Sequence, residues 1–252
     1  MQWTRTTVIA LAAMTLVLAG CDSNDRDAAG DDTAAEHGHD GHMHDGHDEH
    51  AEHAHGQSPT PPQDATKVQP LSAGEEAPTA TLRGPQGEEI DLATKYARKP
   101  TVLIFYRGGW CPYCNTHLGQ IATAEPELLR MGYQVLAISP DRPEELARTL
   151  DKQELTYELL SDSDVELARS FGLAFRVDDP TVEKYRGFGI DLEQASGRDH
   201  HMLPVPAVYI VDTAGVIRFA HWDADYKQRL GPEVLLERAE AIAASSGAGQ
   251  SR

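Results

Sequence analysis

Apolar and polar residues form two kinds of pattern along residues 77–246, one predicting strands and the other predicting helices. Continuous apolar runs predict strands buried on both faces, and apolar residues spaced three or four apart predict helices. The predicted strands are 79–82, 88–92, 101–106, 133–139, 157–160, 207–211 and 216–221. The predicted helices are 112–130 (bent or broken near Pro126), 142–153, 162–171 and 232–244. Residues 173–203 show little periodicity, and we expect an insertion or lid there. This order predicts an α/β domain with a central mixed β-sheet flanked by helices.

The N-terminal 20 residues have a different pattern. A basic residue precedes an apolar run over residues 8–18, and small residues lead to Cys21. This is the layout of a secretory signal peptide, too short for a stable membrane span. Its ending resembles the bacterial lipoprotein signal, whose cysteine is lipidated and becomes the new N-terminus. We expect residues 1–20 to be removed and Cys21 to anchor an exported protein to a membrane, facing the periplasm or the cell exterior. An ordinary signal peptide or an uncleaved anchor is the alternative. Asp22 resembles an inner-membrane retention signal.

Composition separates the next segment from the domain. Residues 21–76 hold 14 acidic and two basic residues and few large apolar ones. Such a segment buries too little surface to offset chain entropy, so we expect a disordered tether that ends in a proline-rich linker. We expect the domain to span residues 77–246 and a disordered tail to span 247–252. The net charge of -18 comes with no basic patch, which argues against a nucleic-acid partner.

The tether contains a run of eight histidines that alternate with carboxylates and glycines. They are His37, His39, His42, His44, His47, His50, His53 and His55. Imidazole binds zinc, copper and nickel, and a flexible repeat wraps a metal without a preformed cage. We expect metal binding here. The alternative is a solvated acidic spacer whose histidines become charged as the pH falls.

A dithiol, Cys111-Pro-Tyr-Cys114, follows the strand 101–106 and two glycines, and opens the next helix. The N–H groups at a helix N-terminus stabilise a thiolate, which is the reactive form of cysteine. Cys114 lies one turn beyond Cys111, so the two sulfurs share a face and close a short disulfide. With Cys21 lipidated, these are the only free thiols. We expect Cys111 to be the more exposed and to have the lower pKa.

Other interpretations of the pair are a buried structural pair and a structural zinc site. Zinc needs two further ligands, and His117 lies on the same helix face as Cys114. Arg107 adds a positive charge near the thiols. The sequence contains no flavin, haem or nucleotide motif, so we expect no organic cofactor.

Four segments accompany the dithiol: Phe105-Tyr106, Ala137–Asp141 (Ala-Ile-Ser-Pro-Asp), Leu159–Asp162 (Leu-Leu-Ser-Asp) and Tyr209–Asp212 (Tyr-Ile-Val-Asp). With the order of elements, they resemble the peroxiredoxin-like branch of the alkyl hydroperoxide reductase/thiol-specific antioxidant superfamily, over about residues 70–245. The resemblance implies a thioredoxin-like fold, a peroxide substrate and a thioredoxin-like reductant.

The chain departs from the signature of that superfamily, Pro-x-x-x-Thr-x-x-Cys. If Cys114 is the peroxide-attacking cysteine, Arg107 stands at the proline position and Cys111 at the threonine position. The threonine hydroxyl that helps to orient the peroxide is therefore missing. The site combines a peroxidase motif with a thioredoxin-type dithiol, and the resemblance implies that Trp110 shields one side of it.

Pro206 precedes the strand 207–211 at the position where thioredoxin-like folds place a cis-proline facing the dithiol. The resemblance implies that Val205 and Pro206 present their backbone to a bound substrate, with an ordinary trans-proline as the alternative. His200 and His201 lie just upstream, and we expect them on the surface.

Three functions remain open from the sequence. The first is a thiol peroxidase that forms a sulfenic acid and then a Cys111–Cys114 disulfide, which a thioredoxin-like donor reduces. In this function, the family motif favours attack by Cys114, and exposure favours attack by Cys111. The second is a dithiol–disulfide oxidoreductase acting on extracytoplasmic proteins, with Cys111 attacking. The third is a metal-handling lipoprotein for copper or zinc.

Overall fold

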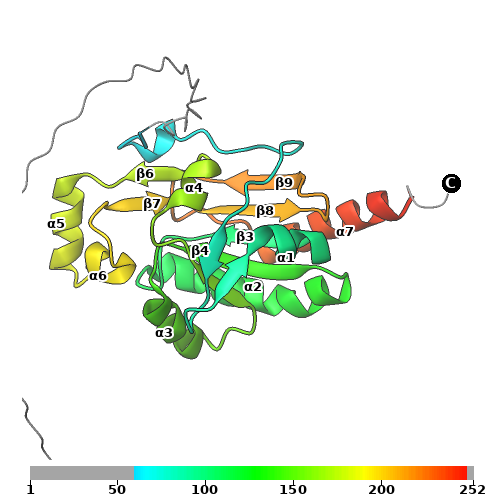
Figure 1. Cartoon of the computed structure of the whole chain (residues 1–252), viewed down its shortest axis with the longest axis horizontal. Coiled ribbons are helices and arrows are strands. Elements are labelled where there is room, and N and C mark those ends of the chain that lie inside the picture. Colours follow the sequence, from blue (N-terminus) through cyan, green and yellow to red (C-terminus); the bar gives the residue numbers. More distant parts are fainter. Residues whose placement is uncertain (1–59, 249–252) are drawn as a thin grey trace, which may run out of the picture. The chain divides into compact units, whose positions relative to one another are not determined.

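The structure is a computed structural model that describes residues 60–248 (Figure 1). The expected signal peptide, Cys21, Asp22 and the eight histidines of 37–55 lie outside the described residues. Within the described range, no helix has both the length and the apolar character that a membrane span needs.

A seven-stranded mixed sheet forms the centre of the domain. Its strands are β1 (Thr81–Arg83), β2 (Glu89–Asp91), β3 (Thr101–Phe105), β4 (Gln134–Ser139), β5 (Glu158–Ser161), β8 (Ala207–Val211) and β9 (Ile217–Trp222). They lie in the order β2-β1-β5-β4-β3-β8-β9. The strands β3, β4 and β5 are parallel, and the hairpins β1–β2 and β8–β9 add antiparallel strands at both sides. The predicted α/β class and mixed sheet are confirmed.

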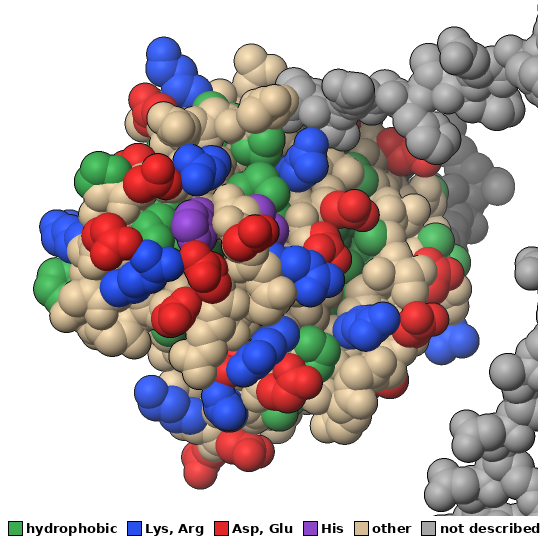
Figure 2. Space-filling view, turned by 60° about the vertical axis from the view of Figure 1, so that its left-hand side comes forward, with side chains coloured by type: hydrophobic (Ala, Val, Ile, Leu, Met, Phe, Trp, Pro, Cys, Tyr) green, Lys and Arg blue, Asp and Glu red, His purple; other side chains and the backbone are tan. Residues whose placement is uncertain are grey.

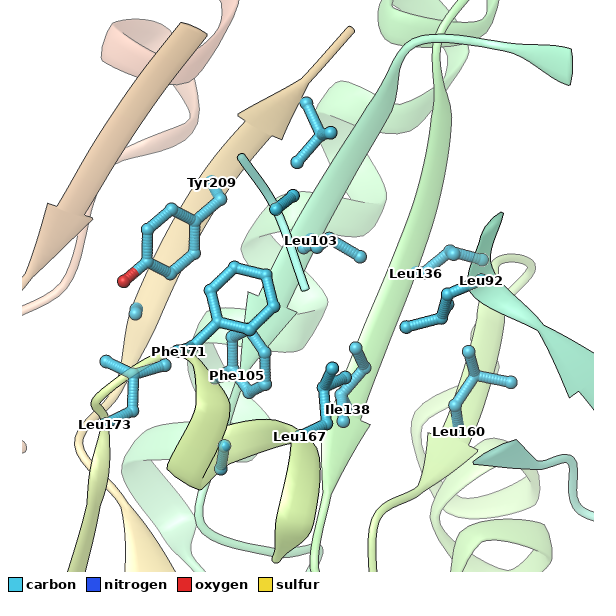
Figure 3. Packing of buried hydrophobic residues seen from close by; sticks show 14 of the residues in the cluster. Leu92, Leu103, Phe105, Leu136, Ile138, Leu160, Leu167, Phe171, Leu173 and Tyr209 are labelled. Carbon is cyan, nitrogen blue, oxygen red and sulfur yellow. The ribbon is translucent and has the colours of Figure 1, made fainter. Parts of the chain in front are cut away.

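Helices cover both faces of the sheet. On one face pack α2 (Pro112–Arg130), α3 (Pro143–Gln153) and α7 (Pro232–Ala248), and on the other pack α1 (Leu92–Arg98) and α4 (Glu166–Ser170). Every residue of β3 is buried, because alternate side chains enter the two cores. Figure 3 shows the α1/α4 side, where Phe105 packs against Phe171 with ring centroids 4.9 Å apart. This double burial places the end of β3, and the dithiol after it, on a rigid element.

The helix α2 runs unbroken through Pro126, so the break considered near that residue does not occur. A proline removes one backbone hydrogen bond from a helix interior. Here Leu118, Ile121 and Leu128 are fully buried on both sides of the proline, and this packing holds the helix together. The helix α1 is an element that the sequence pattern did not predict.

The segment expected as an insertion or lid is folded into short elements: β6 (Ala174–Arg176), α5 (Asp179–Gly187), α6 (Leu192–Ser196) and β7 (Met202–Pro204). They enclose a small apolar cluster of Val177, Val182, Leu192 and Leu203. Elements this short show too few repeats to reveal a period in the sequence. In Figure 1, α5 and α6 lie together at one end of the domain. Figure 2 shows acidic and basic side chains interspersed over this end rather than gathered by sign.

Residues 60–76, expected within the tether and linker, pack on the domain. Val68 is buried in the core on the α1/α4 side, and the carbonyl of Pro62 accepts from the N–H of Arg176 at 2.8 Å. The N–H of Leu71 donates to the carbonyl of Phe171 at 3.1 Å. These contacts place the start of the domain near Pro62 rather than at Ala77. At the other end, α7 continues to Ala248, two residues beyond the expected boundary.

Candidate active site

Two glycines bring the chain from β3 to the dithiol. Gly108 has a φ of 146°, and a Cβ there would lie 2.3 Å from Nε1 of Trp110. A Cβ on Gly109 would lie 1.9 Å from Oγ1 of Thr149 on α3. Both positions therefore need glycine, the first for its backbone conformation and both for the close approach of neighbouring side chains.

Cys111 is the N-cap residue of α2, and Pro112 occupies the first helical position. The Cys111 sulfur lies at this helix N-terminus, where the thiol and the backbone N–H of Cys114 both act to lower its pKa. The side chain of Asn115 fixes the turn, because its Nδ2 donates to the carbonyl of Gly109 at 2.8 Å.

Both thiols are free and almost fully buried, with exposed fractions of 2% for Cys111 and 0% for Cys114. The pKa of Cys111 is lowered to about 6, chiefly by the hydrogen bond that the Cys114 thiol donates to it. The charges of Arg107 and Arg229 contribute to the same shift and burial opposes it. Cys111 was expected to have the lower pKa of the two cysteines, and it does. It was also expected to be the more exposed, but it is only 2% exposed, against 0% for Cys114.

The pKa of Cys114 is raised well above its ordinary value. The main causes are the hydrogen bond with Cys111, burial and the negative charge of Cys111, in that order. The backbone N–H of Arg107 and the guanidinium of Arg229 act in the opposite direction, and Arg229 Nη2 lies 3.6 Å from Cys114 Sγ. Of the two sulfurs, these interactions favour the thiolate at Cys111 and the thiol at Cys114.

Arg107, singled out from the sequence, is a buried cation beside the dithiol. It is 4% exposed, and its guanidinium lies over the rings of Tyr226 at 4.3 Å, Trp110 at 5.3 Å and Tyr185 at 5.6 Å. Its Nη2 donates to the hydroxyl of Tyr185, whose ring also contacts Trp110 at 5.9 Å. The half-buried Trp110 therefore helps to enclose Arg107 next to the thiols.

Residues 223–230, between β9 and α7, cover the dithiol and were not singled out from the sequence. Tyr226 meets the ring of Tyr113 edge-on at 5.6 Å, and Arg229 reaches Cys114. The carbonyl of Leu230 is 3.2 Å from Nε2 of His117 on α2. No periodic pattern marks this segment, and Arg229 is 115 residues from Cys114 in sequence, so only the fold brings them together.

A zinc site at the dithiol finds no support among residues 60–248. His117 is buried with its Nε2 at the Leu230 carbonyl, and burial lowers its pKa to about 4. No group of three or more histidine, cysteine or acidic side chains in this range lies close enough together to hold a metal ion.

Asp141 is a second site residue that was not singled out, although it closes the Ala-Ile-Ser-Pro-Asp segment. It is 1% exposed, and its Oδ2 accepts from the N–H of Gly109 at 2.7 Å. Burial raises its pKa to about 7. The carboxyl fixes the dithiol loop from the end of β4 and lines a cavity of about 280 Å³ together with Trp110 and Thr149.

Val205 and Pro206 lie buried just before β8, whose first residue pairs with Phe105 at the end of β3. The N–H of Val205 donates to the carbonyl of Leu173 at 2.9 Å, and the carbonyl of Pro206 accepts from Asp223 at 3.3 Å. These two groups have hydrogen-bond partners within the fold, and the presentation of this backbone to a substrate stays a prediction. The cis peptide bond at Pro206 stays a prediction.

His200 and His201, expected on the surface, are both partly buried. Nε2 of His200 lies 2.8 Å from the carbonyl of Ser163, and Nε2 of His201 lies 2.7 Å from Oε1 of Glu193. Both tie β7 to its neighbours, and they line a small cavity beside Arg107.

The chain is similar in sequence to known proteins. A family model described as the AhpC/TSA family matches residues 73–220. The chain belongs to this family. Peroxiredoxin Bcp of Escherichia coli is 34% identical over 106 residues, which cover 42% of this chain and 67% of that protein. Peroxiredoxin Bcp of Bacillus subtilis is 29% identical over 101 residues, 40% of this chain and 64% of that protein.

Solved structures agree on the fold of this AhpC/TSA member. Peroxidoxin BcpB from Mycobacterium tuberculosis has a TM-score of 0.53 and 17% identity, covering 69% of this chain and 97% of that chain. Reduced Prx3 from Vibrio vulnificus, in complex with hydrogen peroxide, has a TM-score of 0.54 and 18% identity, covering 67% and 99%. The prediction of a peroxiredoxin-like enzyme with a thioredoxin-like fold is confirmed.

Proposed function

We propose that this protein reduces peroxides through the Cys111/Cys114 dithiol, with Cys111 as the attacking thiolate. One arrangement carries the assignment of Cys111: its sulfur lies at the N-terminus of α2 and accepts from the Cys114 thiol, which lowers the pKa of Cys111 and raises that of Cys114. Membership of the AhpC/TSA family supports the peroxide as substrate.

In the first step, the Cys111 thiolate attacks one oxygen of the peroxide. The S–O bond forms as the O–O bond breaks, and the departing hydroxide or alkoxide takes up a proton, which leaves Cys111 as a sulfenic acid. The sulfur of Cys114 then loses its proton and attacks the Cys111 sulfur, and water leaves as the S–O bond breaks. The resulting disulfide is reduced by the two thiols of a thioredoxin-like donor.

The test compares peroxide consumption by the wild type, Cys111→Ser and Cys114→Ser with a thioredoxin system as the donor. We expect no turnover in either variant. Cys114→Ser should consume one equivalent of peroxide and carry a dimedone-trapped sulfenic acid at Cys111. A sulfenic acid at Cys114 in the Cys111→Ser variant, together with none at Cys111 in the Cys114→Ser variant, would reverse the assignment.

A second candidate function is dithiol–disulfide exchange with exported proteins. It is favoured by the Cys-x-x-Cys spacing, by the lowered pKa of Cys111 and by Tyr113 between the cysteines, which is 45% exposed. Reduction of insulin disulfides by a wild type that consumes no peroxide would establish this function instead.

The N-terminal segment is assigned from sequence alone. We propose that Cys21 is lipidated and tethers the domain outside the cytoplasm, and that the histidines of 37–55 bind zinc, copper or nickel. Mass spectrometry of the mature protein tests the lipid. Metal titration of the full chain against a form lacking residues 37–55 tests the binding, and equal affinities would exclude a role for this segment.

A further inference from the structure

Arg229 approaches the sulfur of Cys114 from the segment 223–230. Its Nη2 is 3.6 Å from Sγ, and its Nη1 donates to the carbonyl of Gln228 at 2.9 Å. Within residues 60–248, no carboxylate lies at ion-pair distance from this guanidinium. The sulfur of Cys114 is therefore the group with which the Arg229 guanidinium can interact as a counter-ion.

Two groups beside Cys114 act in favour of its thiolate, although the resting residue is a thiol. The backbone N–H of Arg107 and the guanidinium of Arg229 both act on this sulfur to lower its pKa. Their effect is outweighed by the hydrogen bond with Cys111, by burial and by the negative charge of the Cys111 thiolate. Once Cys111 has become a neutral sulfenic acid, the opposing negative charge is gone. The two donors then act on the Cys114 sulfur without that opposition.

We propose that Arg229 is a catalytic residue of the resolving step, in which it stabilises the Cys114 thiolate that attacks the Cys111 sulfenic acid. This inference rests on the proposed function. Cys114 gives up its proton, its sulfur bonds to the Cys111 sulfur, and the hydroxyl of the sulfenic acid leaves with a proton as water. The same guanidinium stabilises Cys114 when the disulfide is later reduced and this sulfur departs as a thiolate.

The segment 223–230 is built to hold Arg229 in this place. On one side of Arg229, Tyr226 packs over the guanidinium of Arg107 and against the ring of Tyr113. On the other side, the carbonyl of Leu230 is within hydrogen-bond distance of Nε2 of His117. Both anchors lie beside the dithiol, so Arg229 is fixed to the α2 N-terminus from both ends of its own loop.

The test separates resolution from peroxide attack in Arg229→Gln. Lys227→Gln is the matched control, because it removes the same charge from an exposed position on the same segment. Single-turnover reactions at pH 8, well above the pKa of Cys111, keep the attacking thiolate ionised in all forms. In Arg229→Gln, we expect the rate of peroxide attack to stay within about threefold of the wild-type rate. The Cys111 sulfenic acid, trapped by dimedone, should survive at least about tenfold longer than in the wild type. Over-oxidation to sulfinic acid should rise in parallel.

Arg229→Lys keeps the charge and should recover most of the resolving rate. Equal loss in Arg229→Gln and Arg229→Lys would show a structural role and overturn the proposal, as would resolution in Arg229→Gln as fast as in Lys227→Gln. Arg229→Met, which keeps the apolar stem, replaces the glutamine variant if that variant does not fold. A wild type that forms no sulfenic acid would instead refute the proposed function.

Discussion

Arg107 is a buried cation beside the thiols, and its surroundings explain how the charge is tolerated there. Three aromatic rings lie within 5.6 Å of its guanidinium, and these contacts offset part of the cost of burying the charge. The rings come from the dithiol loop, from α5 and from the segment 223–230. Arg107 thus joins three parts of the chain at the thiols and lowers the pKa of Cys111.

Replacing Arg107 by methionine should raise the pKa of Cys111 from about 6, because one positive charge near the thiolate is lost. Alkylation by iodoacetamide depends on the thiolate, so its pH midpoint should move up by about one unit. Arg148→Gln is the control, because this exposed arginine on α3 is paired with Glu145 rather than placed beside the thiols. An unchanged midpoint in Arg107→Met would exclude the proposed influence of its charge.

A substitution at Gly109 tests how closely the dithiol loop packs on α3. In Gly109→Ala the new methyl group meets Oγ1 of Thr149, so the loop must shift away from α3. We expect slower alkylation of Cys111 at pH 7 and a stability loss of about 1–3 kcal/mol. Adding Thr149→Ala removes the obstructing Oγ1 atom and should restore part of the alkylation rate and part of the stability. No recovery in the double variant would mean that the backbone, rather than this contact, needs the glycine.

At the scale of elements, the continuous apolar strands were predictable, since β3, β4 and β8 are buried on both faces and their sequences show it directly. The dithiol and the helix it opens were predictable for the same kind of local reason. The helix α1 and residues 60–76 were missed because each is short and contributes only one or two large apolar residues. Arg229 and Asp141 were missed as site residues because only tertiary contacts bring them to the dithiol.

Truncation tests the N-terminal boundary. A form beginning at residue 60 keeps the contacts of residues 60–76 with the domain, and we expect it to match the full chain in thermal stability. A form beginning at residue 77 loses the burial of Val68 and the hydrogen bonds of Pro62 and Leu71. We expect it to be destabilised by about 2–4 kcal/mol in urea unfolding. Equal stability of the two forms would return the boundary to Ala77.

At the scale of the whole molecule, the sheet separates two cores, and the dithiol belongs to the one that contains α2, α3 and α7. The buried carboxyl of Asp141 lines a cavity beside the dithiol loop. A carboxyl so placed links the protonation of the site to the stability of the fold.

Burial raises the pKa of Asp141 from 3.8 to about 7 in the folded chain. Its contribution to the free energy of unfolding is therefore complete below about pH 4 and is lost as the pH rises through 7, by at most about 4 kcal/mol. Asp141→Asn keeps an oxygen for the N–H of Gly109 and should abolish this part of the pH dependence. Urea unfolding at pH 5 and pH 8 measures it, in a Cys111→Ser/Cys114→Ser background so that the thiols do not titrate. The prediction would be contradicted if the free energy of unfolding changed equally between pH 5 and pH 8 with and without the Asp141→Asn substitution.

The two guanidiniums beside the sulfurs also bear on the direction in which electrons flow. A thiolate at Cys111 is stabilised only in the reduced protein, since a disulfide carries no charge for Arg107 and Arg229 to meet. Above pH 6 this favours the dithiol over the disulfide, which raises the reduction potential of the couple relative to one with ordinary thiols. The oxidised protein is thus a ready electron acceptor. In the proposed function, a dithiol donor with a lower reduction potential would return it to the reduced form.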